Sequence, residues 1–244
     1  MKNIVIVALT LYVIFLSCAS GPIGLRNVKE INDVSVVNNG QVITCENAEN
    51  IFGKYIIDFI VPNPLYGDYG SSSGRIDPNH ESTIHCRAVL LNDFSTRADI
   101  LSKCRVDSLD EGNCEEFRKN YIEKNLRDGM FRIRIEMESG FSEKSMNPSH
   151  WAIYLENSSG VMIEPSDITD SSVTTFEDSV YSGYYDRNFP RRLLKRDVTL
   201  YFKKTTFFGE DLLSSENPYI ILEMSHKKKT VARIAWKISE ENKR

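Results

Sequence analysis

One short segment has the residue types of a serine hydrolase. Gly70 to Gly74 (GSSSG) fits the G-x-S-x-G pattern of a nucleophile elbow, with Ser72 at its centre and His150 and His226 further along the chain. In such an enzyme the serine attacks a carbonyl carbon while a histidine takes its proton. The elbow requires a buried strand before the serine and a helix after it. Here prolines and glycines precede the motif and Pro78 disfavours a helix behind it. We therefore interpret the segment as a flexible serine-rich loop and keep hydrolysis through Ser72 as the alternative function.

Two further groups of polar residues resemble metal sites. His80 and His85 resemble the H-E-x-x-H motif of zinc proteases, but they are five residues apart instead of four. On an α-helix this spacing turns the second imidazole about 140° away from the first, so the two cannot share an ion. Asp107, Asp110 and Asn113 lack the alternating oxygen ligands of an EF-hand. We therefore predict no metal, no cofactor and no catalytic residue.

The four cysteines that follow Cys18 form an even set, which is typical of disulfides in a chain that leaves the cytoplasm. Cys104 and Cys114 flank a turn-rich stretch between two helical patterns, so we predict that they pair with each other and that Cys45 pairs with Cys86. Free buried thiols are the alternative. Zinc is disfavoured because the sequence contains no Cys-x-x-Cys spacing.

An aromatic and basic segment, Tyr181 to Arg196 (YSGYYDRNFPRRLLKR), stands out in an otherwise acidic chain. Tyrosine and arginine are enriched at protein interfaces because large rings and guanidinium groups bind with little loss of entropy. The alternative is a long connection whose rings pack on a sheet and whose charges face water or anionic lipid headgroups. The candidate binding surface consists of Tyr181, Tyr184, Tyr185, Arg187, Arg191 and Arg192.

The chain begins with an apolar leader. Lys2 and Asn3 precede the apolar run Ile4 to Leu16, and small residues follow from Ser17 to Ser20. The run is too short to cross about 30 Å of hydrocarbon as a helix, which takes roughly 20 residues. This pattern predicts a signal peptide.

The end of the leader resembles the lipobox of bacterial lipoproteins, which is usually Leu, a small residue, Gly or Ala, and then Cys. Leu16 and Ser17 depart from that pattern, in the looser form expected of spirochaete lipoproteins. The resemblance implies cleavage before Cys18, acylation of Cys18 and stable anchoring through two or more acyl chains. The alternative is an ordinary signal peptide that is cut after Ser20 and takes Cys18 with it.

These signals predict a signal peptide over residues 1–17, a lipidated tether over 18–33 and a single β-rich domain over 34–240. The formal net charge of −4 argues against nucleic acid as a partner. The predicted location is the bacterial cell envelope, lipid-anchored at the outer membrane on its periplasmic or surface face.

The pattern of the domain is mainly that of strands. From Phe131 to Glu138 apolar and polar residues alternate, which is typical of a half-buried strand. Apolar residues at helical spacing predict two helices within an insertion at about 94–128. The fold class that we expect is an antiparallel β-sandwich with a short two-helix insertion. Its other strands are predicted at 34–37 and 41–44 as a hairpin over Asn39-Gly40, and at 54–61, 85–91, 151–156, 161–164, 197–208, 218–224 and 230–238.

Residues 130–238 also resemble small leptospiral surface lipoproteins of uncharacterised function, through the proline-rich approach to Trp151, the hairpin after it and Glu164-Pro165. The resemblance supplies no functional residue, and we expect Trp151 to belong to the core. The predicted function is therefore a lipid-anchored envelope or surface protein that acts as a binding or structural module for another protein or a polysaccharide. A periplasm-facing assembly factor is a further alternative.

Overall fold

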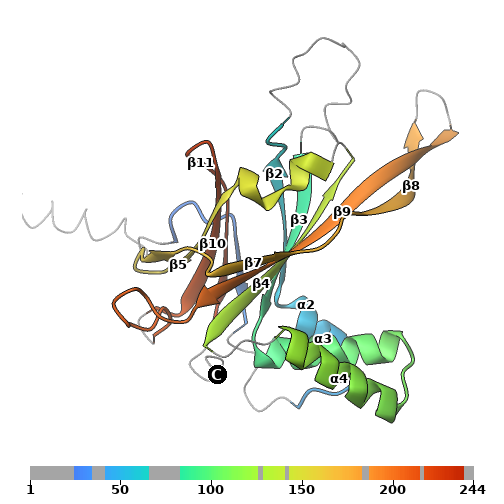
Figure 1. The fold of residues 1–244 in the computed structure, drawn as a ribbon, viewed down its shortest axis with the longest axis horizontal. Coiled ribbons are helices and arrows are strands. Elements are labelled where there is room, and N and C mark those ends of the chain that lie inside the picture. Colours follow the sequence, from blue (N-terminus) through green and yellow to red (C-terminus); the bar gives the residue numbers. More distant parts are fainter. Residues whose placement is uncertain are drawn as a thin grey trace, which may run out of the picture.

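The computed structural model describes residues 25–34, 42–65, 83–125, 129–140, 143–182, 187–214 and 217–238. Within these ranges the chain is mainly β and forms two sheets (Figure 1). This confirms the β-sandwich with a helical insertion that the sequence predicts.

The first sheet has five strands and contains both the first and the last strand of the described chain. Its strands are all antiparallel except for the parallel pairing of β1 with β11, which aligns Glu30 with Ile234. In spatial order they are β1 (Glu30–Asp33), β11 (Lys229–Lys237), β10 (Tyr219–His226), β5 (Ala152–Asn157) and β6 (Met162–Ile163).

The second sheet has six antiparallel strands, and the long strand β9 pairs with three neighbours. Its spatial order is β2 (Ile56–Pro62), β3 (Thr83–Leu91), β4 (Met130–Ser139), β9 (Arg187–Lys203) and β7 (Asp167–Asp170), with β8 (Thr174–Ser182) pairing with the first part of β9.

Apolar side chains of both sheets form one core. Ile133, Ile135 and Met137 of β4 are each at most 2 % exposed, as the alternation predicts. They belong to the same cluster as Trp151 and Trp236, so Trp151 is a core residue as expected. The indole nitrogen of Trp236 in β11 donates a hydrogen bond to the carbonyl of Tyr55 beside β2, at 2.9 Å, and so ties the sheets together.

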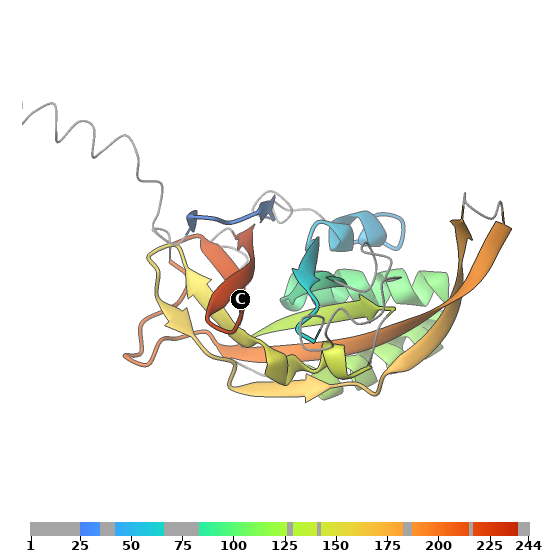
Figure 2. The same cartoon turned by 90° about the horizontal axis from the view of Figure 1, so that it is seen from above.

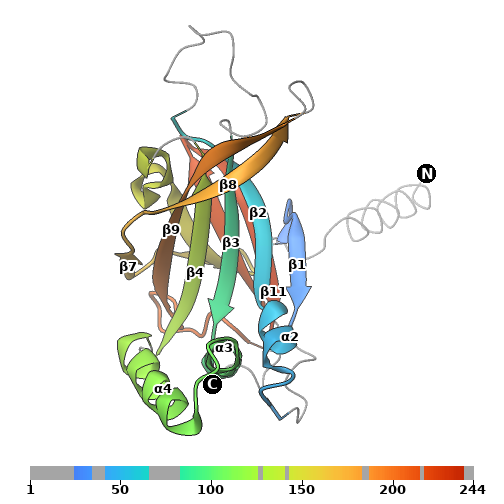
Figure 3. The same ribbon diagram turned by 90° about the vertical axis from the view of Figure 1, so that its right-hand side faces the viewer.

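The helices gather at one end of the six-stranded sheet, and the β8–β9 hairpin extends from the other end (Figure 3). Seen from above, α2 lies close to β1, whereas the β8–β9 hairpin extends at the far end of the molecule (Figure 2). The predicted insertion is confirmed as the helices α3 (Asp93–Val106) and α4 (Glu111–Asn125), and a shorter helix, α2 (Ala48–Gly53), packs beside α3. Two 3₁₀ turns, Glu143–Met146 and Pro148–His150, lead into β5.

One prediction about local structure and one alternative interpretation are wrong. The hairpin across Asn39-Gly40 lacks its second strand, because residues 42–44 are not in a sheet and the chain turns directly into α2. The segment from Tyr181 to Arg196 is not a connection, because most of its main chain lies in the β8–β9 hairpin. The proline and the charges in this segment obscure its strand pattern in the sequence. The strand forms because β9 pairs with β8 along the whole hairpin.

Candidate binding site

Helix α3 is fixed at its start by a capping box. The side chain of Asn92 accepts a hydrogen bond from the main-chain nitrogen of Ser95 at 2.8 Å, and the Ser95 hydroxyl accepts one from the nitrogen of Asn92 at 2.9 Å. Two of the main-chain donors at the helix start are thereby satisfied. This reciprocal cap sets the direction in which α3 leaves β3.

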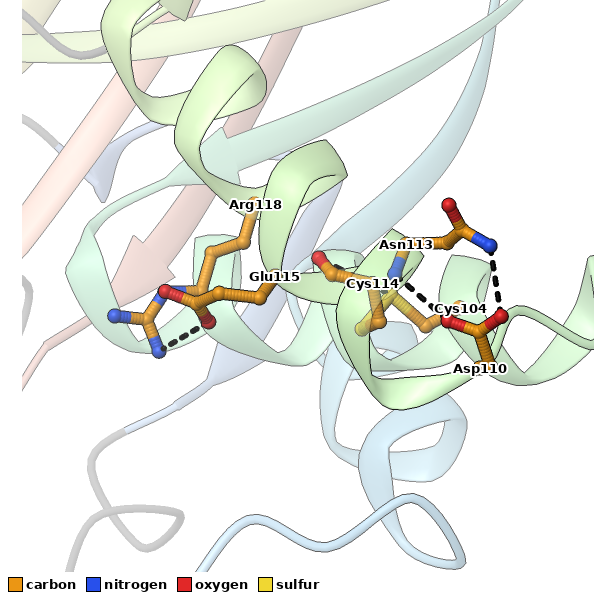
Figure 4. The surroundings of a disulfide bond; sticks show 6 residues. All are labelled: Cys104, Asp110, Asn113, Cys114, Glu115 and Arg118. Carbon is orange, nitrogen blue, oxygen red and sulfur yellow. Dashed lines mark hydrogen bonds and ion pairs between the residues drawn. A yellow bond between two sulfur atoms is a disulfide. The ribbon is translucent and has the colours of Figure 1, made fainter.

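A disulfide and a capped turn hold α4 against α3 (Figure 4). Cys104 and Cys114 form the predicted bond, with their Cα atoms 5.5 Å apart. The carboxylate of Asp110 accepts hydrogen bonds from the main-chain nitrogen and the side-chain amide of Asn113, at 2.9 and 2.8 Å. Asp110 and Asn113 therefore cap the start of α4.

The second predicted disulfide does not form. Cys45 is an exposed free thiol beside α3, whereas Cys86 is a buried free thiol in β3. Cys86 belongs to the core cluster, and burial raises the pKa of its thiol. The even number of cysteines suggested the pairing, but the two residues lie in different surroundings.

On the side that faces the sheet, the helices rest on a buried polar cluster. Asp99 of α3 is 2 % exposed and accepts hydrogen bonds from the Tyr121 hydroxyl at 2.7 Å and the Lys103 ammonium at 3.0 Å. A guanidinium nitrogen of Arg134 in β4 lies 3.7 Å from the same carboxylate oxygen. Burial, together with the charge of Asp99, raises the pKa of Tyr121 to about 12. Asp99 thus joins α3, α4 and β4.

The neighbouring Arg132 overturns part of the strand prediction. The alternation in β4 placed its polar side chains in water, yet Arg132 is only 3 % exposed because the helices cover this end of the sheet. Its guanidinium donates to the Thr96 hydroxyl at 3.3 Å and lies over the Tyr121 ring, 5.7 Å from the ring centre. Burial lowers the pKa of this guanidinium.

The opposite side of the helix pair opens into a groove of about 1380 Å³ between α3, α4 and residues 42–45. Its lining surface is mainly apolar, and the Cys104–Cys114 disulfide forms part of it. Val42 at the groove is 75 % exposed and adds to its apolar surface. The apolar side chains that line the groove include Val42, Ile43, Phe94, Leu101, Leu109 and Ile122.

Charges of both signs surround this apolar surface. Arg97, Arg105 and Arg118 line the groove together with Glu111 and Glu115. Arg118 forms an ion pair with Glu115 at 3.5 Å (Figure 4), and both side chains are about half exposed. The guanidinium of Arg105 donates to the Cys45 carbonyl at 3.3 Å and holds residues 42–45 near α3. The groove is thus an apolar trough with a polar rim and a slight excess of positive charge.

Several predicted site residues lie elsewhere. Cys18, Ser72, Tyr184 and Tyr185 are outside the described residues. The other members of the candidate tyrosine and arginine surface, Tyr181, Arg187, Arg191 and Arg192, have a described main chain in β8 and β9, where Tyr181 faces Asn188 and Arg191 faces Asp178 across the hairpin. The described lining of the groove comes from α3, α4, Leu109 and residues 42–45. Sequence reasoning missed the groove because it placed Val42 and Ile43 in a strand and Cys45 in a disulfide.

The two histidines proposed as partners of Ser72 hold main-chain turns in place. A ring nitrogen of His150 contacts the Lys144 carbonyl at 3.0 Å, and a ring nitrogen of His226 contacts the carbonyl of His150 at 2.8 Å. Because a carbonyl only accepts, each of these ring nitrogens is the donor. Both contacts stabilise the approach to β5.

Within the part of the chain that the structure describes, no three histidine, cysteine or acidic side chains gather as metal ligands. No helix among these residues has the length and apolar character needed to cross a membrane. No protein-family model and no curated protein sequence matches the chain. The proposals below therefore rest on the residues and their geometry.

Proposed function

We propose that the chain is a lipid-anchored bacterial envelope protein that binds a partner protein through the groove between α3, α4 and residues 42–45. The anchor would be an acylated Cys18, which the resemblance of the leader to a lipobox implies. The observation that carries the binding function is the apolar groove itself. An exposed apolar surface of this kind marks a binding site more often than an inert surface.

The occupant that suits this groove best is an amphipathic segment of another protein. Its volume of about 1380 Å³ is larger than the roughly 300 to 1000 Å³ of sites that enclose a small molecule. The lining surface is mainly apolar, whereas a polysaccharide would need many polar partners. An apolar helix face laid into a groove is a common mode of peptide recognition. The three arginines at the rim favour a segment with acidic residues beside its apolar face.

The groove is also well suited to binding because it is pre-formed. The capping box of α3, the disulfide and the Asp99 cluster fix both helices before any partner arrives. Rigid walls reduce the entropy that is lost on association. Rigid apolar walls with a polar rim are sufficient for binding a partner, which needs no catalytic group in the groove.

Site-specific photo-crosslinking in intact cells tests the groove with a matched pair of valines. Val42 and Val106 are 75 % and 72 % exposed, but only Val42 lines the groove. A photoreactive residue at position 42 should give a discrete adduct of protein mass, and the same residue at position 106 should not. Prior reaction of Cys45 with a bulky maleimide should abolish the adduct, because Cys45 lines the same groove. A lipid-sized adduct, or equal adducts from both positions, would refute the protein occupant.

The intact mass of the protein from membranes tests the anchor separately. A lipid-bearing mass that begins at Cys18 is expected, and a Cys18→Ala variant should lose the lipid. Reduction should add two protons, for the one disulfide between Cys104 and Cys114. An unlipidated mass that begins at Gly21 would contradict the anchoring and leave the groove experiment unaffected.

A further inference from the structure

Two adjacent phenylalanines stand at the tip of the connection between β9 and β10. Phe207 is 96 % exposed and Phe208 is 86 % exposed, which makes them the most exposed large apolar side chains of the described residues. Their ring centres are 5.6 Å apart and the rings meet edge to face, at 85°. Single exposed apolar residues are common, but two neighbouring aromatic rings in water at one tip mark a contact surface.

The loop that carries them is a closed turn. The main-chain nitrogen of Thr206 donates to the Glu210 carbonyl at 2.7 Å, and the nitrogen of Gly209 donates to the Thr206 carbonyl at 3.0 Å. Gly209 has a φ of +82°, which a side chain would strain, so the turn directly after Phe208 requires glycine. Below it, Leu212 is fully buried in the core. The two rings therefore project from a fixed base.

The position of the loop relative to the start of the chain suggests what the rings contact. In Figures 1 and 2 the β9–β10 loop and β1 both lie toward the left-hand end, with α3, α4 and the β8–β9 hairpin to the right, and in Figure 2 β1 lies at the upper edge and the loop at the lower edge. Cys18 is seven residues before Leu25, where the described chain begins. Seven extended residues reach at most about 25 Å. A lipid on Cys18 would therefore hold this side of the domain close to the bilayer surface.

Charge at the loop points to an apolar contact with lipid. Lys203 and Lys204 precede the two rings, and Glu210 and Asp211 follow them, so the formal charges cancel. Attraction to anionic headgroups is then weak, while aromatic side chains are well suited to the boundary between headgroups and acyl chains.

We propose that Phe207 and Phe208 insert into the bilayer that holds Cys18, so that the protein contacts the membrane at two points. This inference rests on the lipid anchoring proposed above. Two contacts fix the orientation of the domain, whereas a flexible tether alone leaves it free to rotate. The groove beside α3 and α4 is then held on the side that faces away from the membrane.

Quenching of tryptophan fluorescence by brominated acyl chains tests this contact. The full lipidated protein is reconstituted into phosphatidylcholine vesicles as the wild type, F208W or V106W. The two native tryptophans, Trp151 and Trp236, are 6 % and 0 % exposed, so they are shielded from lipid. Val106 is the control because it is 72 % exposed and is the last residue of α3, which lies on the right-hand side of Figure 1. Brominated lipid should quench the added emission of F208W and leave that of V106W unchanged.

The outcomes separate the contact from the anchor. Unquenched emission from F208W in protein whose mass carries the lipid would overturn the membrane contact and leave the anchor standing. A mass without lipid would overturn the anchor. The unanchored full chain would then be mixed with the same vesicles. If F207S/F208S abolishes its binding to the vesicles, the aromatic contact is still supported. If the double variant binds the vesicles as well as the wild type does, the aromatic contact is overturned.

Discussion

The hydrogen bond between Tyr121 and Asp99 should hold the helix pair on the sheet, and its strength can be measured with Tyr121→Phe and Asp99→Asn. The hydroxyl lies 2.7 Å from a carboxylate that is 2 % exposed, so the bond is buried and charge-assisted. Bonds of this type contribute about 1.5 to 3 kcal/mol, and we expect Tyr121→Phe to lower the free energy of unfolding by that amount.

Removal of the carboxylate charge should cost more. Asp99→Asn leaves the ammonium of Lys103 without this counter-charge and the guanidinium of Arg134 with Glu136 alone, at 3.4 Å. Loss of one member of a buried ion pair typically costs about 3 to 5 kcal/mol. Lys103 is 38 % exposed, so its share should be at most about 1 kcal/mol. Most of the loss should therefore come from Tyr121 and Arg134.

A double-mutant cycle isolates the bond. Urea unfolding can be followed by the fluorescence of Trp151 and Trp236, which are buried in the core. The double variant should lose about 1.5 to 3 kcal/mol less than the sum of the single losses. Tyr219→Phe in β10 combined with Asp99→Asn is the control, and its losses should add within about 0.5 kcal/mol. A coupling energy for Tyr121 that is no larger than that of the control would refute the proposed clamp.

Three further predictions concern the cysteines and a buried phenol. Replacement of Cys104 and Cys114 by serine should lower the free energy of unfolding by about 2 to 3 kcal/mol in urea titrations, because the bond closes a short loop; an unchanged midpoint would contradict this. Cys45 should react with a maleimide in the native protein because its thiol is exposed. Cys86 should react only after unfolding, because its thiol is buried and burial raises its pKa. Mass spectrometry of the labelled peptides tests both expectations. Burial raises the pKa of Tyr55 from 10.0 to about 12. The phenol therefore contributes about 3 kcal/mol to the free energy of unfolding below pH 10, and this contribution is lost as the pH rises from 10 through 12. In Tyr55→Phe the free energy of unfolding should fall by about 3 kcal/mol less over the same pH range.

The sequence predicts the β-sandwich because the signals that define it are local. Phe131 to Glu138 alternate, and Phe94, Ala98 and Leu101 recur at helical spacing, so strand and helix can be recognised without their neighbours. The Cys104–Cys114 disulfide is predictable for the same reason, since its loop is short. The apolar run around Trp151 likewise marks a core strand.

The features that were missed depend on which elements meet. Arg132 has the pattern of an exposed residue, and only the docking of α3 and α4 buries it. The groove needs residues 42–45 to lie beside helices that begin some fifty residues later. The pairing of Cys45 with Cys86 failed because an even count of cysteines carries no information about distance. The tyrosine and arginine segment remains a prediction, with its main chain in a hairpin.

The parallel pairing of β1 with β11 bears on how late the first sheet can be completed. Glu30 is aligned with Ile234, about two hundred residues later in the chain, so β1 has its partner only after nearly the whole polypeptide has emerged. Ordering the first part of the chain against the last is a long-range step, which is slow compared with the formation of local hairpins. If the leader directs export as proposed, the stretch after it would stay unpaired during translocation and accessible to processing enzymes, and the first sheet would be completed last. Release of the C-terminal strand would then set the moment at which β1, next to the proposed anchor, becomes fixed.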